Sequence, residues 1–147
     1  MKLTSFTDYS LRVLIYVAAA PGDRATIGEI ARAFGISENH LVKVVHLLGR
    51  AGLLVNTRGR GGGLALARPA EEIGVGAVVR LTEGGDCPAE CFRADNTCAI
   101  APVCRLASVL DDAFKAFYRV LDGCTLADLL HNRAELVSIL RLQPRPA

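Results

Sequence analysis

The stretch TIGEIARAFGISENH, residues 26–40, decides the fold. Thr26 and Glu29 have the Thr-x-x-Glu spacing of a capping box, which predicts that a short helix begins directly after Thr26. Gly35 stands where that helix must end, because glycine readily adopts the left-handed conformation that follows a helix. Ser37 is a favourable N-cap for a second helix. Two helices joined by a tight turn at a glycine predict a helix-turn-helix.

The second of these helices, which extends through Ala51, begins with polar residues. In a helix-turn-helix, the N-terminal residues of the second helix usually contact the bases. We therefore predict that Ser37, Asn39, His40 and Lys43 face DNA. An ordinary pair of antiparallel helices is the alternative, and it is less favoured because the turn glycine and both caps fall within twelve residues.

A β-hairpin is predicted next, because strand-like residues 53–57 and 64–67 flank the sequence RGRGGG. Arg58 and Arg60 bring two positive charges to a tip with few side chains, which suits the narrow minor groove. A nucleotide phosphate loop is disfavoured, because the Gly-Lys-Ser/Thr ending and the following helix are missing. The helix-turn-helix and the hairpin together predict a winged helix-turn-helix.

The chain has 147 residues and a net charge of +2 that is unevenly distributed. Residues 1–70 hold nine basic and four acidic residues, a net +5, whereas residues 71–147 hold eight and eleven, a net −3. A basic N-terminal half is expected of a DNA-binding protein. The chain is 51% hydrophobic, yet no apolar run is long enough for a membrane span and no secretory signal is recognisable. We expect a cytoplasmic protein.

The fold class predicted is mainly α with a small β-hairpin wing, followed by a long C-terminal dimerisation helix. An amphipathic helix is expected over residues 7–20 before the helix-turn-helix, while residues 73–81 fit either a helix or a buried strand. From Val103 to Leu121 a broad apolar face recurs at helical spacing, which is typical of a dimer interface. Another capping box at Thr125 and Asp128 predicts a short helix through His131.

These patterns predict four units along the chain: a winged helix-turn-helix domain at 1–82, a cysteine-rich loop at 83–103, the dimerisation helix and a C-terminal helix at 104–142, and a disordered tail at 143–147. The enzyme class is disfavoured, because the sequence offers no nucleophile–base arrangement.

Five cysteines without a secretory signal favour a metal or redox site over a disulfide framework. Cys91, Cys98 and Cys104 lie in a segment with few bulky apolar residues, so core packing does not explain them. Their spacing favours an iron–sulfur cluster, with zinc and a thiol/disulfide switch as alternatives. A cluster held by three thiolates lacks one protein ligand, for which Cys87 and a carboxylate or histidine from elsewhere are candidates. Cys87 has no firmer role than this, and Cys124 is interpreted as a small buried apolar residue.

The sequence resembles the Rrf-type winged-helix repressors that carry iron–sulfur clusters, and within them the nitric-oxide-sensitive subgroup. The resemblance covers the chain to about residue 130. It rests on LTSFTDY at residues 3–9, the turn GIS at 35–37, the wing RGRGGGL at 58–64, the three cysteines, and LD followed by TLADL at 121–129.

This resemblance implies a homodimer on a palindromic DNA operator, with Cys91, Cys98 and Cys104 holding each cluster and Asp8 of the other subunit as the fourth ligand. A 4Fe–4S cluster is favoured over 2Fe–2S. Arg12 lies one turn after Asp8 and is placed to pair with that carboxylate. The expected protein is a bacterial repressor that releases its operator when nitric oxide nitrosylates the cluster. A same-fold regulator that senses redox state or cluster occupancy is the alternative.

Overall fold

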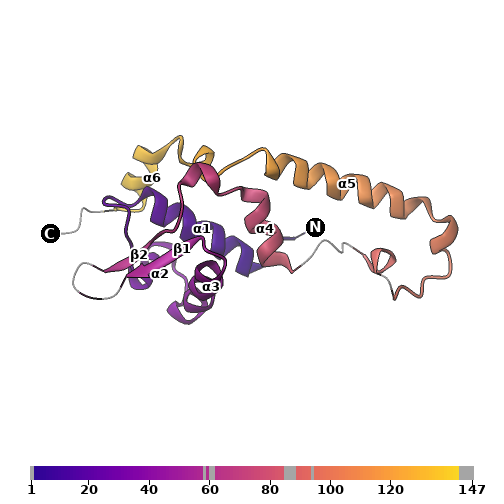
Figure 1. Cartoon of the computed structure of the whole chain (residues 1–147), viewed down its shortest axis with the longest axis horizontal. Coiled ribbons are helices and arrows are strands. Elements are labelled where there is room, and N and C mark those ends of the chain that lie inside the picture. Colours follow the sequence, from indigo (N-terminus) through magenta and orange to yellow (C-terminus); the bar gives the residue numbers. More distant parts are fainter. Residues whose placement is uncertain (1, 58, 60–61, 85–88, 94, 143–147) are drawn as a thin grey trace.

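The computed structural model describes residues 2–57, 59, 62–84, 89–93 and 95–142. Figure 1 shows a head, formed by the N-terminal helices, the hairpin, α4 and α6, from which the long helix α5 projects. The helices and strands are α1 (Ser5–Ala19), α2 (Ile27–Phe34), α3 (Glu38–Arg50), β1 (Leu54–Thr57), β2 (Gly63–Leu66), α4 (Val75–Glu83), α5 (Arg105–Asp122) and α6 (Arg133–Ile139). This architecture confirms the predicted fold class.

The helix-turn-helix has the local bonds that its sequence predicts. The Thr26 N–H donates to Glu29 Oε2 at 2.6 Å, and the Glu29 N–H donates back to Thr26 Oγ1 at 3.3 Å. Gly35 ends α2 in the left-handed conformation, with φ of +64°. Ser37 Oγ then accepts from the His40 N–H at 3.4 Å, which starts α3.

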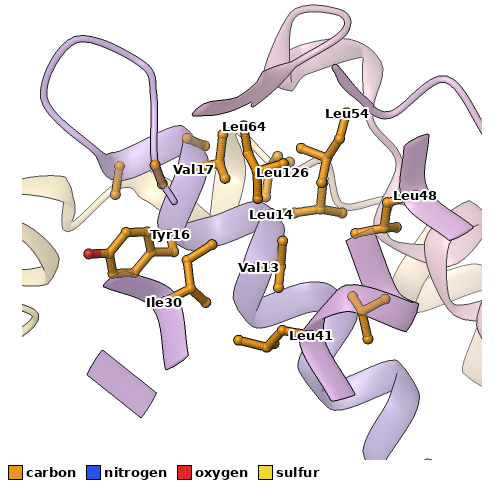
Figure 2. Close-up of a cluster of buried hydrophobic side chains, with 14 of the residues drawn as sticks. Val13, Leu14, Tyr16, Val17, Ile30, Leu41, Leu48, Leu54, Leu64 and Leu126 are labelled. Atoms are coloured by element: carbon orange, nitrogen blue, oxygen red, sulfur yellow. The ribbon is translucent and has the colours of Figure 1, made fainter. Parts of the chain in front are cut away.

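The core of the head forms around α1. Val13, Leu14 and Val17 have no exposed surface, because α1 is covered by α3, by α4 and by the hairpin. Figure 2 shows how side chains from the other elements converge on them; these are Ile30, Leu41, Leu48, Leu54, Leu64 and Leu126. Each fully buried side chain of this size contributes about 2 kcal/mol through the hydrophobic effect.

The two strands pair antiparallel, with Leu54 opposite Leu66 and Thr57 opposite Gly63. A bridge to the loop before α2 fixes the hairpin on the head: Leu64 N–H donates to the Ala25 carbonyl at 2.7 Å, and Ala25 N–H donates back at 3.0 Å. Since Leu64 is also buried, the base of the wing is held firmly.

Residues 73–81, for which the sequence allows either a helix or a strand, are helical from Val75 onward and form most of α4. Backbone hydrogen bonds join the start of α4 to the segment that follows α5. The Val75 N–H donates to the Cys124 carbonyl at 2.9 Å, and the Leu126 N–H donates to the Ile73 carbonyl at 2.8 Å. These bonds tie the end of α5 to the start of α4. None of the helices in the described ranges has the length and apolar character to span a bilayer.

The short helix predicted after Thr125 is present as a 3₁₀ helix, Asp128–Leu130, which ends one residue before His131. The Thr125 capping box is present too, with the Thr125 N–H donating to Asp128 Oδ2 at 2.8 Å. The tail predicted to be disordered, 143–147, lies outside the described residues.

Candidate functional site

The first turns of α3 expose all four residues that we predict to face DNA: Ser37, Asn39, His40 and Lys43. The opposite side of the helix is fixed in the core by Leu41, Val44 and Leu48, which have no exposed surface. The polar side is therefore presented on a rigid support. Arg58 and Arg60, expected at the tip of the wing, lie outside the described residues.

Asp8 lies in the first turn of α1 and forms the predicted ion pair with Arg12. The Arg12 Nη2 atom lies 2.9 Å from Asp8 Oδ2, and Arg12 Nε donates to Asp8 Oδ1 at 3.0 Å. Both side chains are about half exposed. The carboxylate is therefore oriented within its own helix while one side stays open to solvent.

Two ring contacts link this turn of α1 to the helix-turn-helix. The Arg12 guanidinium lies 5.6 Å from the centroid of the Phe34 ring, at the end of α2. The ring of Tyr9, the residue after Asp8, lies 6.3 Å from that of His40 on α3. A change in the position of Asp8 would therefore reach both helices of the DNA-binding motif through direct neighbours.

Glu83, the last residue of α4, fixes the N-terminus of α1. Its carboxylate accepts from the Thr4 N–H at 2.8 Å, from Thr4 Oγ1 at 3.0 Å and from the buried Thr7 hydroxyl. The Thr7 hydroxyl bond is the main reason that the pKa of Glu83 lies below its usual value, and the two Thr4 bonds lower it further. The positive end of the helix dipole also stabilises a carboxylate at a helix N-terminus. The turn that bears Asp8 is thus tied to the helix that leads into the cysteines.

The described part of the cysteine loop, the segment between α4 and α5, lies away from the head and leads into the N-terminal end of α5 (Figure 1). Two short 3₁₀ turns shape it, Glu90–Phe92 and Ala101–Val103. Cys91 and Cys104 are partly buried and Cys98 is exposed, and all three are free thiols. Cys87 lies outside the described residues, and Cys124 is a partly buried free thiol against α4.

The three thiols have donor chemistry that fits an iron–sulfur cluster, since thiolates are its usual protein ligands. They are free, at least partly accessible, and carried by one irregular loop of fourteen residues from Cys91 to Cys104. Within the described part of this single chain, however, no three Cys, His, Asp or Glu side chains gather closely enough to hold a metal ion. Asp8, on the head, is not brought to the loop by its own subunit.

Three positions that the sequence did not single out prove important for the geometry: Glu83, Arg80 and Asp122. Arg80 on α4 forms a two-bond ion pair with Asp122 on α5, with Nη1–Oδ1 at 2.6 Å and Nη2–Oδ2 at 2.7 Å. Their partners are 42 or more residues away, so no local spacing signals them. Asp122 belongs to the LD pair at 121–122 that contributes to the family resemblance, but the sequence assigns it no role.

A capped helix-turn-helix with an exposed polar recognition surface and a firmly based hairpin defines a winged-helix DNA-binding protein. Comparison with known protein families identifies the family: residues 3–132 match Rrf2, described as an iron-dependent transcriptional regulator. The match covers most of the chain, which therefore belongs to the Rrf2 family. The protein is a DNA-binding transcriptional regulator, and the prediction that it is not an enzyme is confirmed by its relatives.

Among curated proteins, the chain is 49% identical over 146 residues to the HTH-type transcriptional regulator NsrR of Halalkalibacterium halodurans, covering 98% of this chain and 100% of that protein. It is 48% identical to the HTH-type transcriptional regulator NsrR of Bacillus subtilis, covering 97% of this chain and 99% of that one. The similarity therefore extends through the head, the cysteine loop and the long helix.

Solved structures share the fold. The global cysteine regulator CymR of B. subtilis aligns with a TM-score of 0.72 and 28% identity, covering 88% of this chain and 95% of that one. IscR of T. potens aligns with a TM-score of 0.73 and 27% identity, covering 92% and 90%. CymR is described as a global cysteine regulator, and both alignments cover most of this chain.

Proposed function

We propose that this protein is a transcriptional repressor that senses nitric oxide through an iron–sulfur cluster and releases its operator when nitric oxide reacts with that cluster. The observation that carries the proposal is the chemistry and place of the donors: three free thiols belong to the loop that leads into α5, while Asp8 lies on the head and is oriented by Arg12. High identity to NsrR regulators supports the same function.

Dimerisation through α5 is part of the proposal. Along this helix Leu106, Val109, Ala113, Ala116 and Val120 are all exposed, and they recur at alternating spacings of three and four residues. That spacing is the heptad pattern of a helix that packs against another helix. The predicted broad apolar face thus divides in two, because Phe114, Phe117 and Leu121 instead pack towards α4.

DNA binding would use both heads of the dimer on a palindromic operator. Ser37, Asn39, His40 and Lys43 would enter the major groove at each half-site. We assign Arg58 and Arg60 to the minor groove, as their place in the sequence suggests. Repression requires chromosomal DNA, so we place the protein in the cytoplasm of a bacterium.

Cys91, Cys98 and Cys104 would hold the cluster, with Asp8 of the other subunit as the fourth ligand, and we favour 4Fe–4S. The cluster supplies iron, the atom to which nitric oxide binds. The chain supplies the position of the carboxylate: Arg12 orients Asp8, and the Glu83 bonds to Thr4 and Thr7 fix the turn that carries it. The contacts of Arg12 with Phe34 and of Tyr9 with His40 connect that turn to α2 and α3.

A regulator of the same fold that uses its cysteines as a thiol/disulfide switch is the second candidate. The exposed thiol of Cys98 favours it, because an accessible thiol can be oxidised. The two candidates differ in iron content. A colourless, iron-free protein that binds its operator fully after anaerobic purification would overturn the cluster proposal and support the switch.

The role of Asp8 is tested by the variant Asp8→Ala, with Asp112→Ala, an exposed acidic residue on α5, as the matched control. We expect Asp8→Ala to change the cluster absorbance and its nitric oxide response, since one ligand is lost. The control should behave as wild type. An unchanged spectrum and an unchanged nitric oxide response in Asp8→Ala would remove Asp8 from the ligand set.

A further inference from the structure

The arm α5 is joined to the head at one end. Its C-terminal turns pack on α4, where Tyr118 is buried in one cluster with Val75 and Val79. The opposite end of α5 leads to the cysteine loop (Figure 1). At 1.5 Å per residue, the 18 residues of the helix span about 27 Å, so a rotation of about 5° at the packed end moves the far end by about 2 Å.

Arg80 and Asp122 connect the two helices at this packed end. Their two hydrogen bonds, at 2.6 and 2.7 Å, form the parallel arrangement that fixes orientation as well as distance. The Arg80 guanidinium also lies 4.1 Å from the centroid of the Tyr118 ring, within the range of a cation–π contact. One arginine on α4 therefore contacts two consecutive turns of α5.

Both helices accept an unfavourable residue at this contact. Asp122 is the last residue of α5, where a negative charge opposes the helix dipole. Gly76 lies in the first turn of α4, where glycine is a poorer helix former than alanine. A Cβ atom at Gly76 would lie 2.0 Å from Asp122 Oδ1 and 3.1 Å from the Asp122 backbone nitrogen. Residues that oppose local preference often mark a functional contact.

We propose that Gly76, Arg80 and Asp122 form a joint that sets the angle between the head and the arm, and that this joint transmits the state of the cysteine loop to the spacing of the two DNA-binding heads. The inference rests on the proposed function, because it assigns a route between the sensing loop and the recognition helices. Arg80 and Asp122 are positioning residues: they act through the contact that they form between α4 and α5.

The test compares wild type with Asp122→Asn, which removes the charge and keeps the size, and with Gly76→Ala, which displaces the carboxylate and keeps the charge. Asp111→Asn is the matched control, since it breaks another ion pair of α5, with Lys115 at 2.5 Å, away from the joint. Operator affinity is measured for cluster-loaded and cluster-free protein. Small-angle scattering of the cluster-free proteins reports the angle between head and arm, and thermal melting verifies folding.

We expect Asp122→Asn and Gly76→Ala to keep the cluster spectrum while the ratio of loaded to cluster-free affinity falls at least tenfold below that of wild type and the control. Their maximal dimension in scattering should change or broaden. Arg80→Lys, which retains the charge, should preserve more of the ratio than Asp122→Asn. A folded Asp122→Asn protein with the wild-type ratio and wild-type scattering would overturn the joint.

The proposed function can fail separately. If wild type shows no difference between loaded and cluster-free affinity, cluster sensing is wrong, and scattering alone then decides the joint: an altered profile in Asp122→Asn supports it, and an unaltered profile overturns it. If Gly76→Ala does not fold, the decision rests on Asp122→Asn, which adds no atoms to the close contact between the helices.

Discussion

Glu83 shows how one residue can fix the geometry of the proposed site. Its carboxylate receives bonds from Thr4 and Thr7 at the start of α1, one residue before Asp8, although it belongs to the end of α4. The Thr7 hydroxyl is buried and also bonds to Thr82 Oγ1 at 2.8 Å, so the contact extends into the packed interior. The ionised form of Glu83 is therefore the form that the fold favours.

We expect Glu83→Gln to lower the free energy of unfolding at neutral pH by about 1 kcal/mol, as loss of bonds to a charged acceptor does. The pKa of Glu83 lies below its ordinary value of 4.5 in the folded protein. Its stabilising effect is thus present above about pH 4.5 and is lost as the pH falls through the folded pKa. Urea unfolding of cluster-free protein at pH 7 and near pH 4 should show the difference from wild type shrinking at the lower pH.

Glu71→Gln, which neutralises an exposed carboxylate, serves as the control. Its free energy of unfolding should match that of wild type at both pH values. A Glu83→Gln difference that stays constant between pH 7 and pH 4 would show that the carboxylate charge has no part in the contact, because the neutral and ionised forms would then be equally stabilised.

At the scale of elements, the turn between α2 and α3 determines how the recognition helix is presented. Gly35 has a φ of +64°, and no atom lies within 4 Å of the place where a Cβ would stand. The requirement for glycine is therefore conformational and not steric. The same turn is closed by the Ile36 N–H, which donates to the Ala31 carbonyl at 3.0 Å.

Gly35→Ala should therefore lower the free energy of unfolding by about 1 kcal/mol, the usual cost of an L-residue in the left-handed region. Gly35→Asn should cost less, because asparagine tolerates that conformation. Thermal or urea unfolding of both variants measures the order. Equal stability of Gly35→Ala and wild type would mean that the turn relaxes to another conformation.

The sequence predicts the helix-turn-helix and the hairpin well because their signals are local: caps at Thr26 and Ser37, and glycines at the turns. It leaves α4 undecided because Gly74 and Gly76 weaken every local preference. The close approach of Asp122 to Gly76, 46 positions along the chain, explains the second glycine. Among site residues, the Asp8–Arg12 pair is predictable from helical spacing, whereas Glu83 and Arg80 have distant partners that no spacing reveals.

On the scale of the whole molecule, charge and apolar surface are separated. The N-terminal half carries the net +5 and the exposed α3 surface, while the half with net −3 carries the loop and the arm. Affinity for DNA should then depend on salt through the head alone, since each phosphate contact releases counterions.

Lys43→Ala should weaken operator binding and reduce the slope of log affinity against log salt concentration by about one. Lys115→Ala, which removes an equal charge from the arm, should leave the slope unchanged, because Lys115 is paired with Asp111 on α5. Titrations at several salt concentrations measure both slopes. A change of slope in Lys115→Ala, or none in Lys43→Ala, would place the DNA surface elsewhere.

The exposed apolar stripe of the arm α5 predicts that two subunits associate through this helix. In this stripe Leu106 is 61% exposed, Val109 60% and Val120 75%, and an apolar surface of this kind marks an interface that a second copy would cover. Val109→Asp would bury an unpaired charge in that interface, at a cost of about 3 kcal/mol or more, which raises the dimer dissociation constant more than about a hundredfold. Sedimentation should then show a monomer at micromolar concentration.

Ile139→Asp is the matched control, because Ile139 on α6 is 78% exposed but lies off the arm. It should sediment as wild type and bind the operator normally. Val109→Asp should lose operator affinity together with dimerisation, since one head occupies one half-site only. A Val109→Asp protein that remains dimeric would show that this face of α5 does not join two subunits. A wild-type protein that sediments as a monomer would also exclude Asp8 as a ligand from a partner subunit.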